Sequence, residues 1–210
     1  MRGWDCGIGT QFGEGSRARK AVMADSTRFD ATIERIDAVN AQDPHGKELL
    51  YARRMTAWLA RIEPGASEAL RIAARGQHVR RWAIPRSDYP MDRIGYLTWR
   101  TTLYKFHAEE LAGIMAGTGY DAEAIARVGS LVRKERIKTD AEAQTLEDVI
   151  CLVFLENYFA DFAAGHEEEK VVGILRKTWR KMSARGQAEA LKLPMPGEAR
   201  RLVEKALGGE

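Results

Sequence analysis

The chain has 210 residues, with 33 basic and 30 acidic side chains and a formal net charge of +3. A chain of this length is expected to form one domain with a hydrophobic core of its own. Because basic and acidic residues nearly balance, the total charge gives no indication of nucleic-acid binding. The longest apolar run, at 149–155, is too short to cross a bilayer. Cys6 and Cys151 are too few for a disulfide framework, so we predict a reduced thiol in a cytoplasmic protein.

The first 22 residues show no helical periodicity. They are rich in glycine and lack the apolar core of a signal peptide. We therefore interpret 1–22 as a disordered leader, with Met23 as a more plausible start of the chain, and 23–210 as a single all-helical domain.

Apolar residues recur at spacings of three and four along most of the remaining chain, a pattern typical of helices with one buried face. The first helix contains Phe29, Ile33 and Ile36, with Ser26 or Thr27 available as its cap. Further helices are predicted at about 47–62, 70–78, 92–115, 121–135, 141–164 and 171–182, with a short one after Pro196.

Two features of this pattern indicate the architecture. No segment of useful length alternates with period two, so the predicted fold class is all-α. The helix at 141–164 is apolar almost all round from Ile150 to Leu155, which predicts a buried central helix. We expect a bundle of about seven or eight helices around it, with Asp121 capping the fifth helix and Gly186 ending the seventh.

Four ionisable side chains interrupt apolar faces on four different predicted helices: His78, His107, Glu135 and Asp148. Burying such groups is unfavourable unless they have partners, so we expect the four to converge. Two imidazoles with carboxylates suit Mn, Fe, Ni or Zn, and an open position would hold an activated water. In this hypothesis His78, His107 and Asp148 are metal ligands, and Glu135 is a fourth ligand or the general base.

Each of the four also has a purely local interpretation. A lone histidine near a helix end often only donates to carbonyl groups. Asp148 follows Thr145 by three residues and would complete a capping box if a helix began there. Glu135 lies in the run RKER and would be a solvated salt-bridge partner. Only a shared location in space distinguishes a site from these alternatives.

The segment between the two histidines is the most cationic and aromatic of the chain, and acids are scarce in it. Arginine matches the geometry of phosphate and carboxylate groups, which predicts a site for an anion. The alternative is a salt-bridged surface on which arginine stems pack against aromatic rings. The later basic runs at 133–138 and 176–181 alternate with acids and are interpreted as helix surfaces. The predicted substrate-binding residues are Arg80, Arg81, Trp82, Arg86, Tyr89 and Arg100, together with Tyr51.

The order of these elements resembles that of the HD-domain superfamily of metal-dependent phosphohydrolases over about residues 47–160. The stretches YARRMTAWLA (51–60), AARGQH (73–78) and TLEDVICL (145–152) carry the resemblance. It implies metal ligands at His78, His107 and Asp148. The chain departs from the superfamily's pattern in three places: Tyr51 stands at its first histidine position, Val79 at the aspartate of its His-Asp pair and Glu135 at a later histidine.

A closer resemblance runs nearly end to end from Phe29 to Leu207. Phrases such as KELLYARRMTAWL, AARGQHVRRWAIPRSDYP, GYLTWRTTLYKFHAEE and QTLEDVICLVFLENYFADF are similar to proteins grouped as domain of unknown function 4202. This resemblance implies an all-helical, HD-like protein and supplies no activity. It also supports Met23 as the start.

Two functions from different classes follow as expectations. The first is a metal-dependent hydrolase acting on a small molecule that contains phosphate. The second is a non-catalytic module in which the arginine-rich segment binds an anion, a nucleotide or, less favoured, a nucleic-acid backbone. A third expectation is an assembly protein whose exposed tryptophan and tyrosine residues form a homodimer surface. No membrane partner is expected.

Overall fold

The computed structural model describes residues 14–208, and their side chains from residue 27 onward. The helices are α1 (Glu14–Asn40), α2 (Glu48–Ile62), α3 (Glu68–Arg75), η1 (Arg81–Ala83), η2 (Arg86–Asp88), α4 (Arg93–Ala116), α5 (Ala122–Val132), α6 (Ala141–Asn157), α7 (Phe159–Ala164), α8 (Glu168–Trp179), α9 (Ala184–Ala190) and α10 (Gly197–Leu207). No strand occurs in this part of the chain, so the fold class is all-α. None of these helices is long and apolar enough to span a membrane.

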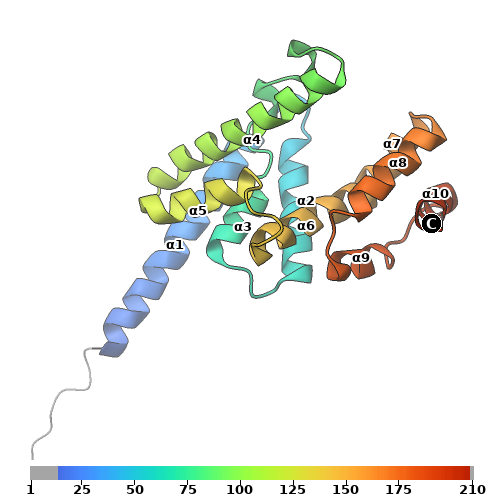
Figure 1. The fold of residues 1–210 in the computed structure, drawn as a ribbon. Helices are drawn as coiled ribbons and strands as arrows, with labels where there is room; N and C mark the ends of the chain where they lie inside the picture. The colour runs from blue at the N-terminus through green and yellow to red at the C-terminus, as the bar shows by residue number, and fades with distance from the viewer. Residues whose placement is uncertain (1–13, 209–210) are drawn as a thin grey trace, which may run out of the picture.

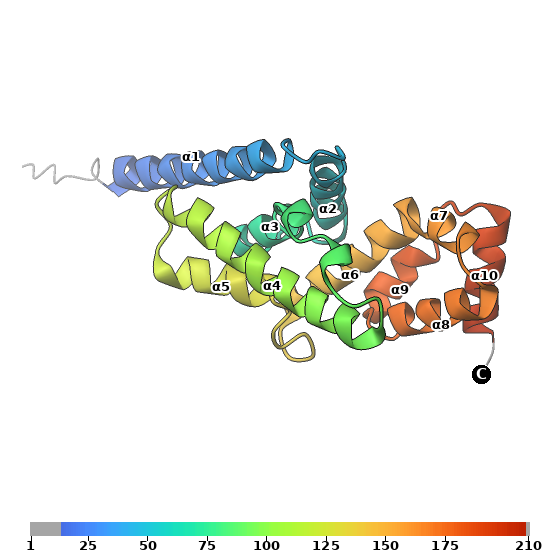
Figure 2. The same cartoon turned by 90° about the horizontal axis from the view of Figure 1, so that it is seen from above.

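Helix α6 connects two groups of helices (Figures 1 and 2). On one side α1 to α5 pack together, with α4 running along α5 and with α2, α3 and α5 contacting α6. On the other side α7 to α10 gather beyond its end, with α10 against α8 and with α9 against α6. The central position predicted for the 141–164 region therefore belongs to α6.

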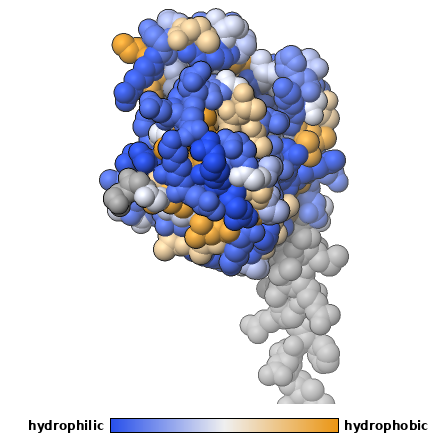
Figure 3. All heavy atoms as spheres, turned by 90° about the vertical axis from the view of Figure 1, so that its right-hand side faces the viewer, coloured by the Kyte–Doolittle hydropathy of each residue, from blue (hydrophilic) through white to orange (hydrophobic). Residues whose placement is uncertain are grey.

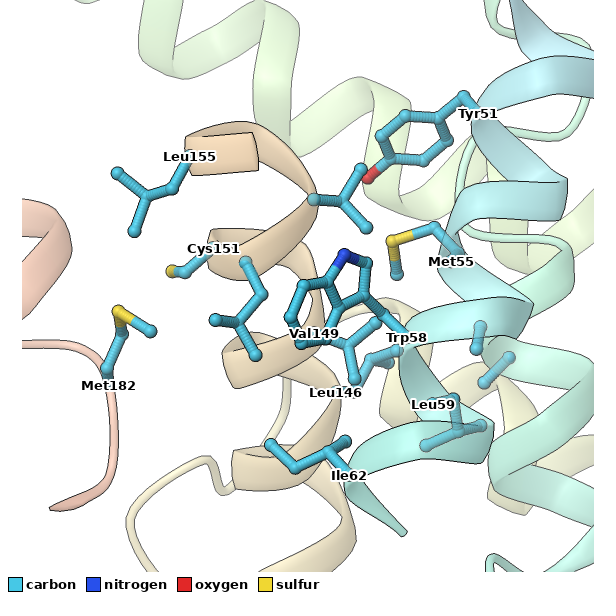
Figure 4. Packing of buried hydrophobic residues seen from close by; sticks show 14 of the residues in the cluster. Tyr51, Met55, Trp58, Leu59, Ile62, Leu146, Val149, Cys151, Leu155 and Met182 are labelled. Atoms are coloured by element: carbon cyan, nitrogen blue, oxygen red, sulfur yellow. The ribbon is translucent and has the colours of Figure 1, made fainter. Parts of the chain in front are cut away.

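The core between α2 and α6 is formed by facing apolar rows (Figure 4). Trp58 from α2 lies against Leu146 and Val149 from α6, and all three are buried. The Trp58 Nε1–H donates to Glu156 Oε2 at 2.6 Å, so the indole also has its polar partner on α6. Cys151, on the same helix, is a buried free thiol.

The cap predicted at Asp121 is confirmed, and Asp92, at the predicted start of the fourth helix, is also a cap. The Asp92 side chain accepts from Gly95 N–H at the start of α4, and Asp121 accepts from Ala124 N–H at the start of α5. These carboxylates satisfy backbone donors that the first helical turn leaves without partners.

Three boundaries differ from expectation. Residues 14–22, expected in a disordered leader, are the first turns of α1, so Ser26 and Thr27 lie inside a helix and do not cap it; residues 1–13 lie outside the described part of the chain. The sixth predicted helix breaks at Tyr158, whose φ of −132° ends α6 before α7 begins. The seventh ends at Trp179 rather than at Gly186, because Gly186 lies in a separate helix, α9, capped by Ser183.

The turn between α3 and η1 depends on a glycine. A Cβ placed on Gly76 would lie 2.4 Å from Leu111 Cδ2 and 3.0 Å from its Cγ. Leu111 in α4 is fully buried, so neighbouring side chains restrict any shift of its side chain. The absence of a side chain at Gly76 therefore lets the turn at 76–80 lie directly on α4.

We expect Gly76→Ala to lower the free energy of unfolding by about 1–3 kcal/mol, because the added methyl overpacks a buried contact. Gly113→Ala is the matched control, since a Cβ at Gly113 in α4 meets nothing within 4 Å. Alanine is the better helix former, so the control should be neutral or stabilising by up to about 1 kcal/mol. Urea denaturation followed by circular dichroism measures both, and equal effects would contradict the packing argument.

Candidate functional site

His78 lies in the turn at 76–80, beyond the end of α3. Its imidazole stacks on the ring of Tyr51 from α2, with ring centroids 3.9 Å apart and planes 9° from parallel. Its Nδ1 lies 3.4 Å from Glu48 Oε2, one helical turn before Tyr51. The His78 side chain is 24% exposed, so a solute can reach it from solvent.

His107 lies beside it and is almost fully buried in α4. The two imidazole centroids are 6.0 Å apart. His107 Nδ1 lies 2.8 Å from the carbonyl oxygen of Val79, and because a carbonyl only accepts, Nδ1 carries the proton and donates. The other nitrogen, Nε2, is buried without a hydrogen-bond partner. It is therefore a bare lone pair, which a native structure rarely buries without a reason.

Three cations surround the two imidazoles. Burial lowers the pKa of His78 well below 6.5, and the charges of Arg81, Lys134 and Arg100 lower it further. Burial, together with the neighbouring His78, also lowers the pKa of His107 to about 3. Both imidazoles are therefore neutral at physiological pH, in a region that already carries positive charge.

Two of these cations lack an acidic partner. Arg81 lies over the ring of Trp99, with its Cζ 4.7 Å from the ring centroid. Arg100 donates to the hydroxyl groups of Tyr96 and Tyr104. Within residues 27–208, neither guanidinium forms an ion pair with a carboxylate. Arg81 and Arg100 thus carry positive charge that no carboxylate of this part of the chain contacts directly, while Glu48 acts on Arg81 from a longer distance.

The third cation is held by a buried carboxylate. Lys134 Nζ lies 2.5 Å from Glu147 Oε2, and the two side chains are 12% and 5% exposed. Although burial opposes ionisation of Glu147, the charge of Lys134 keeps its pKa below the ordinary value. The Lys134 ammonium also lies 5.5 Å from the centre of the Tyr104 ring.

Glu48 is the acidic group closest to His78. Burial raises the pKa of Glu48 to about 7. The charge of Asp43 also raises this pKa, whereas the charge of Arg81 lowers it. Below that pH the carboxyl group is neutral, and above it a negative charge appears next to the imidazole. Ionisation of Glu48 thus changes the charge of the site near neutral pH.

The backbone is strained where two of the segments approach the site. Arg80 has φ of 54° and Lys134 has φ of 60°, in the left-handed region that favours glycine. Such residues cost on the order of 1–3 kcal/mol each and persist where surrounding contacts hold them, often at functional sites. Here they place Arg81 and the Lys134 ammonium near the two histidines.

Asp148 lies elsewhere and links α6 to the start of α9. Its Oδ1 accepts from Ser183 N–H at 2.8 Å and from Gln144 Nε2 at 3.1 Å, and its Oδ2 accepts from Ser183 Oγ at 2.5 Å. Gly186 packs against it so closely that a Cβ there would lie 2.7 Å from the carboxyl carbon. The capping-box interpretation with Thr145 does not hold either, because α6 begins at Ala141 with Asp140 as its cap.

Glu135 also lies apart from the histidines. Helix α5 ends at Val132, and Glu135 follows in an exposed turn where it pairs with Arg133 at 2.7 Å. Among the residues described, no group of three or more His, Cys, Asp or Glu side chains is placed to hold a metal ion. The structure brings together His78 and His107 and not the expected set of four, so its donor set does not fit the implied metal.

The other predicted substrate-binding residues divide in the same way. Tyr51, Arg81 and Arg100 border the histidines, as described above. Arg80 is half exposed and pairs with Glu110 at 3.3 Å. Arg86 donates to the carbonyl groups of Tyr89 and Pro90 and holds its own loop together. Trp82 and Tyr89 are half-buried in the same irregular segment.

Sequence reasoning missed Glu48, Tyr104 and Lys134. Glu48 precedes Tyr51 by three residues and Tyr104 precedes His107 by three, so each lies on the same helix face as a residue already selected. The interpretation of 133–138 as a helix surface was wrong for Lys134, because the helix ends before it and its left-handed backbone turns the side chain inward to Glu147.

We expect Asp148→Ala to lower the free energy of unfolding by about 2–4 kcal/mol, because it leaves the Ser183 and Gln144 donors without their acceptor. Asp30→Ala, at an exposed position of α1, should change it by no more than about 0.5 kcal/mol. Denaturant titration measures both. A ligand role without a structural one would instead leave the stability of Asp148→Ala unchanged.

Comparison with known proteins identifies one relationship. A family model described as Domain of unknown function (DUF4202) matches residues 30–203. This match spans every element that borders the two histidines, from α2 to α6. No curated protein and no solved structure matches the chain.

Proposed function

We propose that this chain, which belongs to the DUF4202 family, binds a small molecule through a phosphate group at the site formed by His78, His107, Arg81 and Arg100. The observation that carries the proposal is the buried, unpartnered Nε2 of His107 beside two arginines that have no carboxylate partner. Each of these features is unfavourable in the empty protein, and one ligand group relieves both.

Charge selects the kind of ligand. Arg81 and Arg100 together offer two positive charges, while the charge of Lys134 is offset by Glu147. Guanidinium groups match phosphate oxygens in pairs and bind them more strongly than neutral donors do. A phosphate ester, with a charge between −1 and −2 near neutral pH, is the matching partner.

The proton selects phosphate among anions. His107 Nε2 needs a donor, because Nδ1 already carries the ring proton and donates it to Val79. A phosphate ester has its second pKa near 6 and so brings a P–O–H group that donates to Nε2. Sulfate has no such proton at this pH. The site should therefore prefer phosphate to sulfate, even though the two anions have the same shape.

The resemblance to HD-domain proteins supports the location. Two of that superfamily's histidine positions are His78 and His107, and these are the two that lie together. The proposal uses no metal, because the remaining ligand positions are Tyr51, Val79, Glu135, which pairs with Arg133, and Asp148, which pairs with Ser183. We favour a small ligand over a nucleic-acid backbone because His107 is almost fully buried.

Hydrolysis of the bound ester is a second candidate. It would use the P–O–H proton that the proposed ligand donates to the unpartnered His107 Nε2: water attacks phosphorus, the bond to the ester oxygen breaks, this proton passes to the leaving oxygen, and both water protons stay on the released phosphate. Release of inorganic phosphate from a panel of nucleotides and sugar phosphates tests it. His107→Gln should abolish turnover, and binding without any turnover by the native protein would leave the binding function alone.

We expect inorganic phosphate to bind at pH 6.5 and Arg81→Gln to weaken it by about 10- to 100-fold, the effect of losing a charged hydrogen bond. Arg80→Gln is the matched control, since the neighbouring Arg80 points to Glu110 and is half exposed, and it should change affinity less than about twofold. Isothermal titration calorimetry measures both, with sulfate as the competing anion. Equal affinity for sulfate and phosphate would contradict the role of His107 Nε2.

We also expect phosphate affinity to fall as pH rises through about 7. Glu48 is neutral below its pKa of about 7 and repels an anion above it, and the ligand loses its donated proton over the same range. Glu48→Gln should bind more tightly than the native protein at pH 8 and as tightly at pH 6, because it removes only the charge. Titrations from pH 5.5 to 8.5 measure this, and affinity that increased with pH would be incompatible with both causes.

A further inference from the structure

Four of the six exposed large apolar side chains among the described residues lie close together in the sequence, whereas Leu50 and Leu191 lie elsewhere. Met91 is 81% exposed, Ile94 75% and Leu97 52%, and Tyr96 between them is 42% exposed. By contrast, the face shown in Figure 3 is largely hydrophilic, with apolar residues in small separate groups. Apolar side chains that gather on a surface commonly mark a site of interaction.

The surrounding contacts hold this strip in place. The Arg86 guanidinium donates to the carbonyl groups of Tyr89 and Pro90, and Trp99 Nε1–H donates to the carbonyl of Ile84 at 2.9 Å. Gly95 packs on Pro90 so closely that a Cβ would lie 2.1 Å from the Pro90 carbonyl oxygen. The loop is thus fixed on the first turns of α4, and the apolar side chains remain exposed in an ordered segment.

The strip leads to the phosphate site. Met91 lies just before α4, and Ile94, Leu97, Arg100, Tyr104 and His107 follow along the helix. At a rise of about 1.5 Å per residue, Leu97 lies about 4.5 Å along the helix axis from Arg100, and Ile94 about 9 Å. An apolar surface therefore begins one helical turn from an arginine that lacks a carboxylate partner.

We propose that the ligand of this site is an amphiphile, with its phosphate at Arg100 and His107 and with its apolar chain along Leu97, Ile94 and Met91. This rests on the phosphate site proposed above and names the class of molecule that fills it. A single chain lying along α4 covers the exposed strip and removes it from water, which stabilises the complex in proportion to the area covered.

Two other occupants fit the strip less well. These side chains expose on the order of a few hundred Å², below the roughly 800 Å² that each partner buries in a standard stable protein interface. An anionic bilayer would meet Asp88 and Asp92, which are both exposed beside the strip. The phosphate must also reach a histidine that is 1% exposed, which a headgroup held in a membrane plane does not do. The occupant is therefore a single dispersed molecule.

The test is calorimetric titration of the full chain with methyl, butyl and octyl phosphate, below the concentration at which octyl phosphate forms micelles. We expect affinity to rise about two- to fourfold for each methylene that contacts the strip. Leu97→Ser and Ile94→Ser should remove this dependence on chain length and leave methyl phosphate binding unchanged. Leu191→Ser is the matched control, because Leu191 follows α9 and is 57% exposed there, and it should behave like the native protein.

Each contrary result has one meaning. Equal affinity for the three esters would overturn the amphiphile and leave the phosphate site standing, whereas no binding of any ester would overturn both. Concentration-dependent dimerisation in sedimentation velocity that Ile94→Ser abolishes would assign the strip to a second copy of the chain instead. Binding to phosphatidylglycerol vesicles that octyl phosphate does not displace would assign it to a bilayer.

Discussion

The turn that carries His78 can lie against α4 only because Gly76 has no side chain where the turn meets Leu111. This close approach brings the Val79 carbonyl within 2.8 Å of His107 Nδ1. That hydrogen bond fixes the tautomer of His107 and leaves Nε2 as an acceptor. It also sets the separation of the two imidazoles, so the chemistry of the site follows from one tight contact between backbone and helix.

The electrostatics of the site reinforce the same arrangement. Both histidines stay neutral because they are buried near cations, and two of these cations, Arg81 and Arg100, are held by aromatic groups and not by carboxylates. Arg81 lies on an indole and Arg100 on two phenol hydroxyls. Aromatic partners position a guanidinium while leaving its full charge available to a ligand. A carboxylate in either place would have neutralised that charge.

The sequence predicted the parts of this protein that depend on neighbouring residues. Helical periodicity and capping by Asp121 are local properties, and the structure contains them. The break at Tyr158 and the separate α9 were not predicted, since the apolar pattern continues through the first and Ser183 caps the second only in its tertiary setting. The early start of α1 was not predicted, because glycines and charged residues there leave no regular spacing of apolar residues.

The site was predicted in part for a similar reason. His78 and His107 each interrupt an apolar face, and this signal correctly indicated that they share surroundings. Asp148 gives the same signal, but its partners are donors on Ser183, 35 residues later in the chain. No sequence pattern predicts these partners. Glu135 was placed on a helix that in fact ends at Val132, before Lys134 takes a left-handed backbone.

Adjacent residues of α6 point to opposite parts of the molecule. Glu147 holds Lys134 beside the histidines, while Asp148 holds Ser183 at the start of α9. Because the two carboxylates share one rigid helix, a rotation of α6 that loosens one contact also displaces the other. The start of α9 is thereby linked through a single helix to the ammonium group near the two histidines.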